Sequence, residues 1–284
     1  MARLRCTKAR QKQVPRRPNG GLCRNDNFKF IASADTVTVI DGTTAYVILV
    51  VFVATLIRSA LGFGEALFAV PLLALLLPLQ VAAPLAVLIS ISIAAIIVVQ
   101  DWQKIHLRST GWLVFATLFG IPLGLLLLTS NHQQMAKMTL AIVLLAFSAY
   151  FLFGRKPLHL KTDNLVWLFG CGFFAGILGG AYGMNGPPLA IYGAMRRWSP
   201  QHFRATLQGY FLPASILGMA GYWFAGLWVH AVTHYYLVSL PATIPAILLG
   251  RVLNHRLREE TYLKYVYSGL AAIAAALFVQ ALTS

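Results

Sequence analysis

Long apolar segments alternate with short polar stretches along most of the chain, from about residue 44 onward. Most of these segments approach the roughly 20 apolar residues that a helix needs to cross a bilayer, and the second and seventh are shorter. An unpaired backbone cannot face lipid, and the alternation typical of membrane β-barrel strands is absent, so the pattern predicts helices. The ten predicted segments are 44–61, 65–78, 81–100, 111–129, 136–153, 165–182, 186–195, 205–225, 231–250 and 261–282.

Composition places the chain among membrane proteins. Of its 284 residues, 58% are hydrophobic and only 11% are charged, against roughly 25% charged residues in soluble domains. The three cysteines, Cys6, Cys23 and Cys171, fit neither a disulfide framework nor a zinc-binding spacing. We therefore predict an all-α polytopic membrane protein without a soluble domain after residue 43.

Residues 1–42 differ from the rest of the chain because they carry nine Lys or Arg residues and no long apolar core. Without an apolar core the segment is not a secretory signal peptide. We interpret it as a disordered basic tail or an over-extended start of translation, and a contact with lipid headgroups or nucleic acid is the alternative. For the chain as a whole, whose net charge is +15, most basic residues flank apolar segments, so we expect a lipid bilayer as its surroundings and no nucleic-acid partner.

Basic residues concentrate in alternate loops. The loops around 79–80, 130–135 and 226–230 hold none of them. The positive-inside rule then predicts that the basic loops are cytoplasmic and that both termini lie outside, although the basic tail contradicts this orientation. The four basic loops hold twelve basic residues: Lys104, Arg108, Arg155, Lys156, Lys161, Arg196, Arg197, Arg204, Arg251, Arg256, Arg258 and Lys264.

The chain also repeats itself. ATLIRSALGFGEALFAV (54–70) aligns without gaps on AGILGGAYGMNGPPLAI (175–191), with four identities that include Gly62 on Gly183. Each stretch begins near the end of the first segment of a five-segment half, and a shortened segment follows it. An odd number of segments per half predicts two inverted repeats, which we place at 43–160 and 161–284.

Both aligned stretches interrupt a helix with residues that helices tolerate poorly. Free backbone groups at such breaks are costly in hydrocarbon, so the breaks should line a cavity and, with inverted halves, form broken-helix or re-entrant hairpins whose tips meet near the midplane. Pro187 suits the first turn of the seventh segment, whose free N–H groups would attract anions. The alternative is that these small residues only allow close helix packing. The residues concerned are Gly62, Gly64, Gly183, Asn185, Gly186, Pro187 and Pro188.

Two charges stand beside the first break. Arg58 lies about fifteen residues into its segment, where an arginine is costly. It could contact a substrate anion through its fork of donors, form a structural ion pair with Glu65, or snorkel to an interface. Glu65 could in turn load and release a proton, because burial favours its neutral form while Arg58 favours its charged form.

Further candidates lie near the two breaks. Ser59, Tyr182 and Asn185 supply neutral polar groups at a similar predicted depth. Arg204, whose aligned position in the first half is Ala83, is either a positive-inside anchor or part of a vestibule that draws anions from the cytoplasm. We expect no metal site, since His230 and His234 lack nearby carboxylates or cysteines.

The stretches SALGFGEALFAVPLLALLLP, GILGGAYGMNGPPLAIYGAMRRW and FRATLQGYFL resemble the TauE/SafE sulfite exporter family, the toluene sulfonate uptake permease group, over about residues 44–282. The resemblance implies a multi-pass transporter of small anions in the bacterial inner membrane, with sulfite, sulfonates and sulfoacetate as the usual substrates. Glu65 and Asn185 depart from the glycine runs of other members.

We therefore predict a secondary transporter of small organosulfur anions that works by alternating access and uses no cofactor. The substrate-binding candidates include Gly64 and Gly186 together with Arg58. A carboxylate transporter, a scaffold subunit and an intramembrane enzyme using Glu65 and Ser59 are the alternatives, although no histidine lies within either break to complete a familiar catalytic arrangement. A homodimer is left open.

Overall fold

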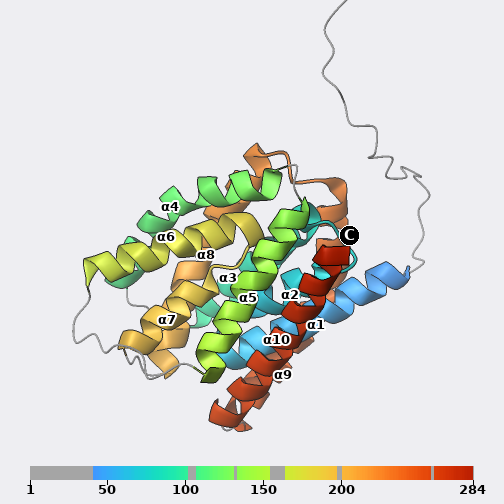
Figure 1. Ribbon diagram of the computed structural model, residues 1–284. Helices are drawn as coiled ribbons and strands as arrows, with labels where there is room; N and C mark the ends of the chain where they lie inside the picture. Colours follow the sequence, from blue (N-terminus) through green and yellow to red (C-terminus); the bar gives the residue numbers. More distant parts are fainter. Residues whose placement is uncertain are drawn as a thin grey trace, which may run out of the picture. The chain divides into compact units, whose positions relative to one another are not determined.

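The computed structural model describes residues 41–101, 107–130, 133–153, 164–196, 200–256 and 259–283. Within these ranges the chain forms ten α-helices and no strand, which confirms the all-α prediction (Figure 1). Each helix coincides with one predicted apolar segment. The helices are α1 (Gly42–Leu61), α2 (Glu65–Ala74), α3 (Leu79–Asp101), α4 (Leu107–Thr129), α5 (Gln133–Phe153), α6 (Leu165–Tyr182), α7 (Gly186–Arg196), α8 (Pro200–Phe224), α9 (His230–Arg256) and α10 (Glu259–Thr283).

Two predictions concern parts of the chain outside these ranges. Of the basic tail, predicted at 1–42, only the last two residues are described. Most of the basic loops also lie outside the described residues, so the prediction that they share one membrane face stays a prediction.

Six helices in the described ranges are long and apolar enough to cross a membrane, each with a span of 18–21 residues. At 1.5 Å per residue such spans are about 27–32 Å long, which matches the hydrocarbon core of a bilayer. The stretch Glu65–Ala74 in α2 is apolar but shorter. The six spans are Gly42–Ala60, Leu79–Val99, Thr110–Thr129, Gln133–Phe153, Leu165–Tyr182 and His230–Gly250.

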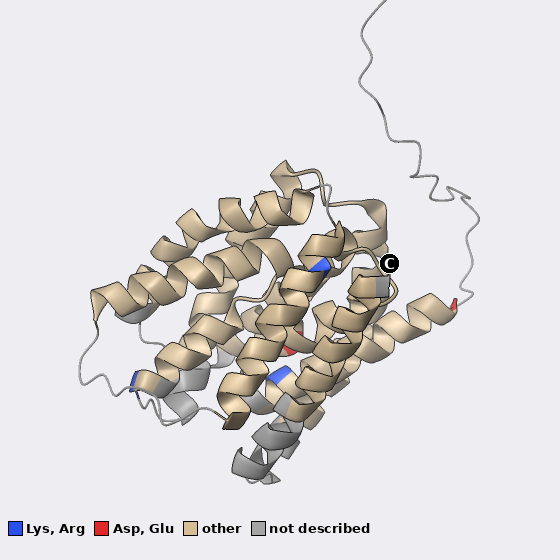
Figure 2. Cartoon of the chain, viewed as in Figure 1, with Lys and Arg blue, Asp and Glu red and all other residues tan. Residues whose placement is uncertain are grey.

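Large apolar side chains are exposed on several helices. Val99, Phe153 and Phe224 are 78%, 84% and 89% exposed, and several leucines on α4 and α9 and Met135 and Ile142 on α5 are more than one third exposed. A soluble monomer rarely presents so much apolar surface. Figure 2 shows, in addition, that nearly all of the described ribbon is free of Lys, Arg, Asp and Glu. Both observations suit helices that face lipid.

Helices α4 and α6 form the most extensive pairing in the molecule and lie side by side (Figure 1). Glycines spaced four apart on both helices make this possible, because a Cβ atom at any of them would collide with the backbone of the other helix. Small residues at this spacing let membrane helices approach closely. The glycines are Gly120 and Gly124 on α4 and Gly172, Gly176 and Gly180 on α6.

Other pairings enclose the two short helices. Helix α1 packs on α9, where Gly250 lies against Ser59 and the Leu56 carbonyl, and α5 packs on α10. Helix α3 packs on α2, α8 and α9. Of the six spans it is the most enclosed, since 67% of its most apolar window is buried, against 28% for α9. Ser90 and Ser92 of α3 contact Ser215 on α8 and Tyr236 on α9 respectively.

Hydrogen bonds gather several helix ends at one end of the bundle. The Gln133 side chain at the start of α5 donates to Gln80 at the start of α3 over 3.3 Å. The Gln134 side chain donates to the Ala281 carbonyl at the end of α10 over 2.7 Å, and the Tyr46 hydroxyl on α1 donates to the Leu72 carbonyl on α2 over 2.8 Å. The starts of α3 and α5 and the end of α10 thus lie at the same end of the bundle.

Candidate functional site

Two helix breaks organise the site. Helix α1 is followed by Gly62 at φ 87° and Gly64 at φ 100°, and α2 begins at Glu65. Helix α6 is followed by Gly183 at φ 68°, and α7 begins at Gly186. Positive φ angles are accessible to glycine without the steric cost that other residues incur, so these glycines are required where the chain leaves each helix.

Several backbone groups at the two breaks are hydrogen-bonded within the protein. The Gly62 N–H donates to the Arg58 carbonyl over 2.6 Å, and the Gly183 N–H donates to the Gly179 carbonyl over 2.8 Å. The Gly62 carbonyl accepts a hydrogen bond of 2.7 Å from the Gln208 side chain on α8. Satisfying these groups offsets the cost of breaking a helix in hydrocarbon.

A small pocket lies between the two breaks. It is lined by Gly64 and Glu65 from the first break, by Gly183, Asn185 and Gly186 from the second, and by side chains from α1, α3 and α8. Its volume of about 20 Å³ accommodates roughly one water molecule. The two glycine-rich breaks, which are more than 100 residues apart in the sequence, therefore form one site.

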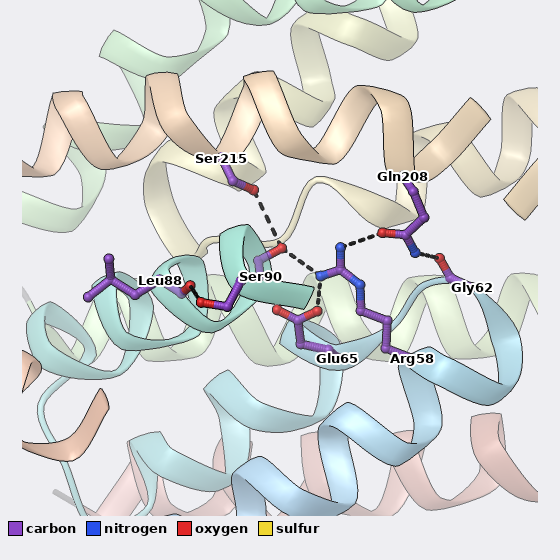
Figure 3. A network of polar contacts seen from close by, with 8 residues as sticks. Arg58, Gly62, Glu65, Leu88, Ser90, Gln208 and Ser215 are labelled. Carbon is purple, nitrogen blue, oxygen red and sulfur yellow. Dashed lines mark hydrogen bonds and ion pairs between the residues drawn. The ribbon is translucent and has the colours of Figure 1, made fainter. Parts of the chain in front are cut away.

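Arg58 is the centre of the polar network in this pocket, and only 2% of its surface is exposed (Figure 3). Its Nη1 forms an ion pair with Glu65 Oε2 and donates to Ser90 Oγ over 2.6 Å. Its Nη2 donates to Gln208 Oε1 over 2.7 Å, and the guanidinium carbon lies 5.0 Å from the centre of the Phe211 ring. The guanidinium is thereby held by residues from α2, α3 and α8.

Gln208 connects this network to the broken helix. Its amide oxygen accepts from Arg58 while its amide nitrogen donates to the Gly62 carbonyl, so both ends of the amide are used (Figure 3). Three further polar atoms are buried without a hydrogen-bond partner among the described residues: Arg58 Nε, Glu65 Oε1 and Asn185 Oδ1. Arg58, Glu65 and Asn185 all line the pocket, so it offers hydrogen-bonding capacity that the fold does not use.

The structure brings together most of the residues predicted for the site. Arg58 pairs with Glu65 across the break and is buried rather than extended toward an interface. Gly62 contacts the network through its carbonyl. The predicted residues that line the pocket are Arg58, Gly64, Glu65, Gly183, Asn185 and Gly186.

Three predicted residues lie elsewhere. Ser59 is buried on the face of α1 that packs against Gly250 of α9. The Tyr182 hydroxyl donates to the Ala136 carbonyl of α5 over 2.9 Å. Pro187 is in the first turn of α7, as predicted, but does not line the pocket. Arg204 belongs to α8, and its side chain lies outside the described residues.

Sequence reasoning missed six residues that line the pocket: Ala66, Leu67, Ser90, Met184, Phe211 and Ser215. Ser90 and Ser215 are polar residues in the middle of otherwise apolar helices, and their side chains lie 3.4 Å apart. A polar side chain at such a depth is itself a sign of a functional or packing role, so this signal could have identified both serines. Phe211 and Met184 carry no comparable signal in the sequence.

Comparison with known proteins identifies the family. The family model described as sulfite exporter TauE/SafE matches residues 47–278, which is most of the chain. The chain belongs to the TauE/SafE family. Neither a curated protein nor a solved structure matches it. Membership of this transporter family, together with the six apolar helices, makes the chain a multi-pass membrane protein of a transporter family.

Proposed function

We propose that this TauE/SafE family member is a secondary transporter of small organosulfur anions, such as sulfite, a sulfonate or sulfoacetate, in the bacterial inner membrane. The substrate is held between the two helix breaks and is moved by alternating access. The observation that carries the proposal is the buried Arg58 side chain in a pocket lined by both breaks.

The chemistry of the pocket suits an oxyanion. A guanidinium offers donors in a planar fork that matches the oxygen atoms of a sulfonate or carboxylate group. Ser90 and Ser215 add hydroxyl groups, and Gly186, the first residue of α7, lines the pocket at the N-terminal end of that helix, where Pro187 and Pro188 contribute no N–H. These groups favour negative charge without a metal or cofactor.

The size of the pocket supports a mechanism that involves conformational change. A space for roughly one water molecule is too small for a sulfite or sulfonate ion, which has at least four heavy atoms. The breaks must separate before an anion can enter. Movement of two units against each other around a fixed site is the usual mechanism of transporters built from inverted repeats.

The packing of the helices supports inverted five-helix repeats. If α1 to α5 are exchanged with α6 to α10 in order, the α4–α6 pairing becomes the α9–α1 pairing, and α4–α8 becomes α9–α3. The pairings α5–α10 and α3–α8 are unchanged by the exchange, and all of these pairings occur. An odd number of helices in each half gives the halves opposite orientations in the membrane, with the breaks as the tips of re-entrant hairpins.

Uptake into proteoliposomes tests the proposal. The labelled substrates are sulfite, methanesulfonate and, because the guanidinium fork also matches carboxylates, acetate. Arg58→Lys keeps the charge but removes the fork, and Lys137→Gln removes a cation that does not line the pocket. We expect saturable uptake of an organosulfur anion that falls at least about tenfold in Arg58→Lys, since one charge-assisted hydrogen bond contributes about 1.5–3 kcal/mol.

The controls separate function from folding. All variants should elute as a single species in size-exclusion chromatography, and Lys137→Gln should transport like the unmodified protein. Equal uptake by Arg58→Lys would make Arg58 a structural charge only. Uptake of acetate alone would identify a carboxylate transporter, and uptake of none of the three anions would contradict the proposed transport function.

A further inference from the structure

Glu65 occupies one of the positions on Arg58 that an anion could use. The guanidinium has five N–H donors, and an oxyanion binds best to two donors on one edge. In the structure Nη1 is used by Glu65 and Ser90, and Nη2 donates to Gln208. The Glu65 carboxylate therefore already makes the charge-assisted contact that a substrate carboxylate or sulfonate would make.

Space leads to the same conclusion. Glu65 lines the pocket, and the remaining volume of about 20 Å³ holds roughly one water molecule. An anion can reach Nη1 of Arg58 only if the Glu65 side chain moves away. Gly64, directly before Glu65, has a φ of 100°, in the left-handed region. Few residues other than glycine could adopt this conformation at the start of α2.

The charge balance of the pocket also limits how an anion can enter. The side chains of Arg58 and Glu65 are 3% and 2% exposed, and together they are neutral. Adding a monovalent anion to this buried pair would leave one uncompensated negative charge in a low-dielectric site, which is costly. Neutrality is restored if Glu65 takes up a proton when it loses Arg58.

We propose that Glu65 is an internal counter-anion that the transported anion displaces from Arg58, with one proton binding to Glu65 for each monovalent anion that enters. In this step the Arg58–Glu65 ion pair breaks, an oxygen of the anion accepts hydrogen bonds from the guanidinium, and a proton from solvent forms an O–H bond on the Glu65 carboxylate. No covalent bond within the anion changes. This inference rests on the proposed function and adds its coupling ion and stoichiometry.

Glu65 is the ionisable side chain near Arg58 that can take up the proton. Among the described residues that line the pocket, Arg58 and Glu65 are the only charged side chains, and those contributed by α3, α8 and the second break are neutral. Helices α5 and α10 also pack against α2. The side chains of α10 that the structure describes, those of residues 268–282, include no charged one, and the described charge on α5, Lys137, does not line the pocket.

A hydrogen-bond acceptor for the protonated form lies in the same pocket. Asn185 Oδ1 is buried and has no hydrogen-bond partner among the described residues, and Glu65 Oε1 is in the same condition. While Glu65 is charged, neither oxygen can donate a hydrogen bond to the other. A proton on Glu65 adds a donor to the pocket, and the amide oxygen of Asn185 can accept it if the two side chains approach each other.

Calorimetry on the purified full-length protein tests this coupling. The probe is methanesulfonate, which stays a monovalent anion over the pH range used. Titration in two buffers of different ionisation enthalpy gives the number of protons taken up per bound anion. We expect about one proton, and an affinity that weakens about tenfold for each unit of rising pH where Glu65 is charged.

Two variants make the test specific. Glu65→Gln mimics the protonated side chain, so we expect it to bind methanesulfonate without proton uptake and with an affinity independent of pH. Its folding is checked by size-exclusion chromatography and by a cooperative thermal unfolding transition without ligand. Glu65→Asp keeps an ionisable group and should retain the proton uptake, as should the control Lys137→Gln. Infrared difference spectra should show a protonated carboxyl band on anion binding that is missing in Glu65→Gln.

The outcomes distinguish the two proposals. Binding without proton uptake by the unmodified protein, or undiminished proton uptake by folded Glu65→Gln, would overturn the coupling role of Glu65 and leave the transporter proposal standing. A folded Glu65→Gln protein that no longer binds methanesulfonate would also overturn it, because a displaced counter-anion is not needed for binding. If the unmodified protein binds neither methanesulfonate nor sulfite, the proposed function fails and this inference fails with it.

Discussion

The two helix breaks share a backbone design but differ in chemistry. Each ends a long helix at a left-handed glycine, Gly62 or Gly183, and each restarts as a short helix within four residues. Only the first break carries charge: the position of Arg58 aligns with Gly179, and that of Glu65 aligns with Gly186. If the two halves are repeats, as we propose, they provide two equivalent backbone arrangements, and the ion pair occupies only one of them.

The residues that cover the breaks differ in the same way. The alignment, extended without gaps, pairs Gln208 with Val87. Gln208 on α8 donates to the Gly62 carbonyl, and Val87 on α3 lies so close to Gly183 that a Cβ atom there would be 2.8 Å from its side chain. Equivalent positions thus cover the two breaks, one with a hydrogen-bonding amide and the other with an apolar side chain. A polar break and a packed break face each other across one pocket.

Removing the charge from the first break should have the largest effect. Arg58→Leu leaves Glu65 buried without its counter-charge, which costs about 3–5 kcal/mol of stability. Arg58→Leu combined with Glu65→Leu should recover most of this loss, because no lone charge remains. Unfolding in mixed detergent micelles measures both, with Lys137→Leu as the control for the loss of a cation outside the pocket. A double variant as unstable as the single one would show that the ion pair does not explain the cost.

Packing dominates at the second break. Gly183→Ala should lose about 1–2 kcal/mol from its positive φ and a further 1–3 kcal/mol from overlap with Val87. Gly226 is a matched control, since its φ of 71° is similar and a Cβ atom there meets nothing within 4 Å. Gly226→Ala should therefore lose only the conformational part. Equal losses in the two variants, measured by the same unfolding assay, would contradict tight packing at Gly183.

A substitution at Gln208 tests whether the first break needs a hydrogen-bonding side chain where the second break has Val87. Gln208→Val gives the first break the cover of the second and leaves the Gly62 carbonyl and Arg58 Nη2 without their present partner, at a cost of about 1–3 kcal/mol. Gln208→Glu is the companion variant, because it keeps an acceptor for Arg58 but loses the donor to Gly62. If Gln208→Val is as stable as the unmodified protein, the amide is dispensable at the first break.

Sequence analysis predicted much of this fold because apolar periodicity and helix-breaking residues are local signals. All ten helices and both breaks were located from them, and Arg58 and Glu65 were recognised as unusual because charges are costly at that depth. Ser59 and Tyr182 were misplaced relative to the pocket for a geometric reason. Adjacent residues on a helix face different directions, so Ser59 turns toward α9 while Arg58 turns toward the pocket.

The partners of Arg58 could not be predicted in the same way. Ser90 and Gln208 reach it from α3 and α8, which are 32 and 150 residues further along the chain. Such contacts depend on how the helices pack, and that arrangement is set by small residues such as those between α4 and α6 rather than by any local pattern. The alignment of the two halves reduces the number of helices that have to be considered as partners of Arg58, since it pairs the helices that cover the two breaks.

The smallest effect on stability is expected at Asn185, which belongs to the second break and lines the pocket together with Glu65 of the first break. Its Oδ1 atom has no hydrogen-bond partner among the described residues, so Asn185→Ala removes no satisfied hydrogen bond of that oxygen and should change stability by less than about 1 kcal/mol. Methanesulfonate binding should nevertheless weaken and its pH dependence should shift, because the protonated Glu65 loses its acceptor. Asn185→Ser, which retains an acceptor oxygen, should preserve more of the binding. If Asn185→Ala instead destabilises the protein as much as Gly183→Ala, the second break is a packing element throughout, and Glu65 must find its acceptor elsewhere.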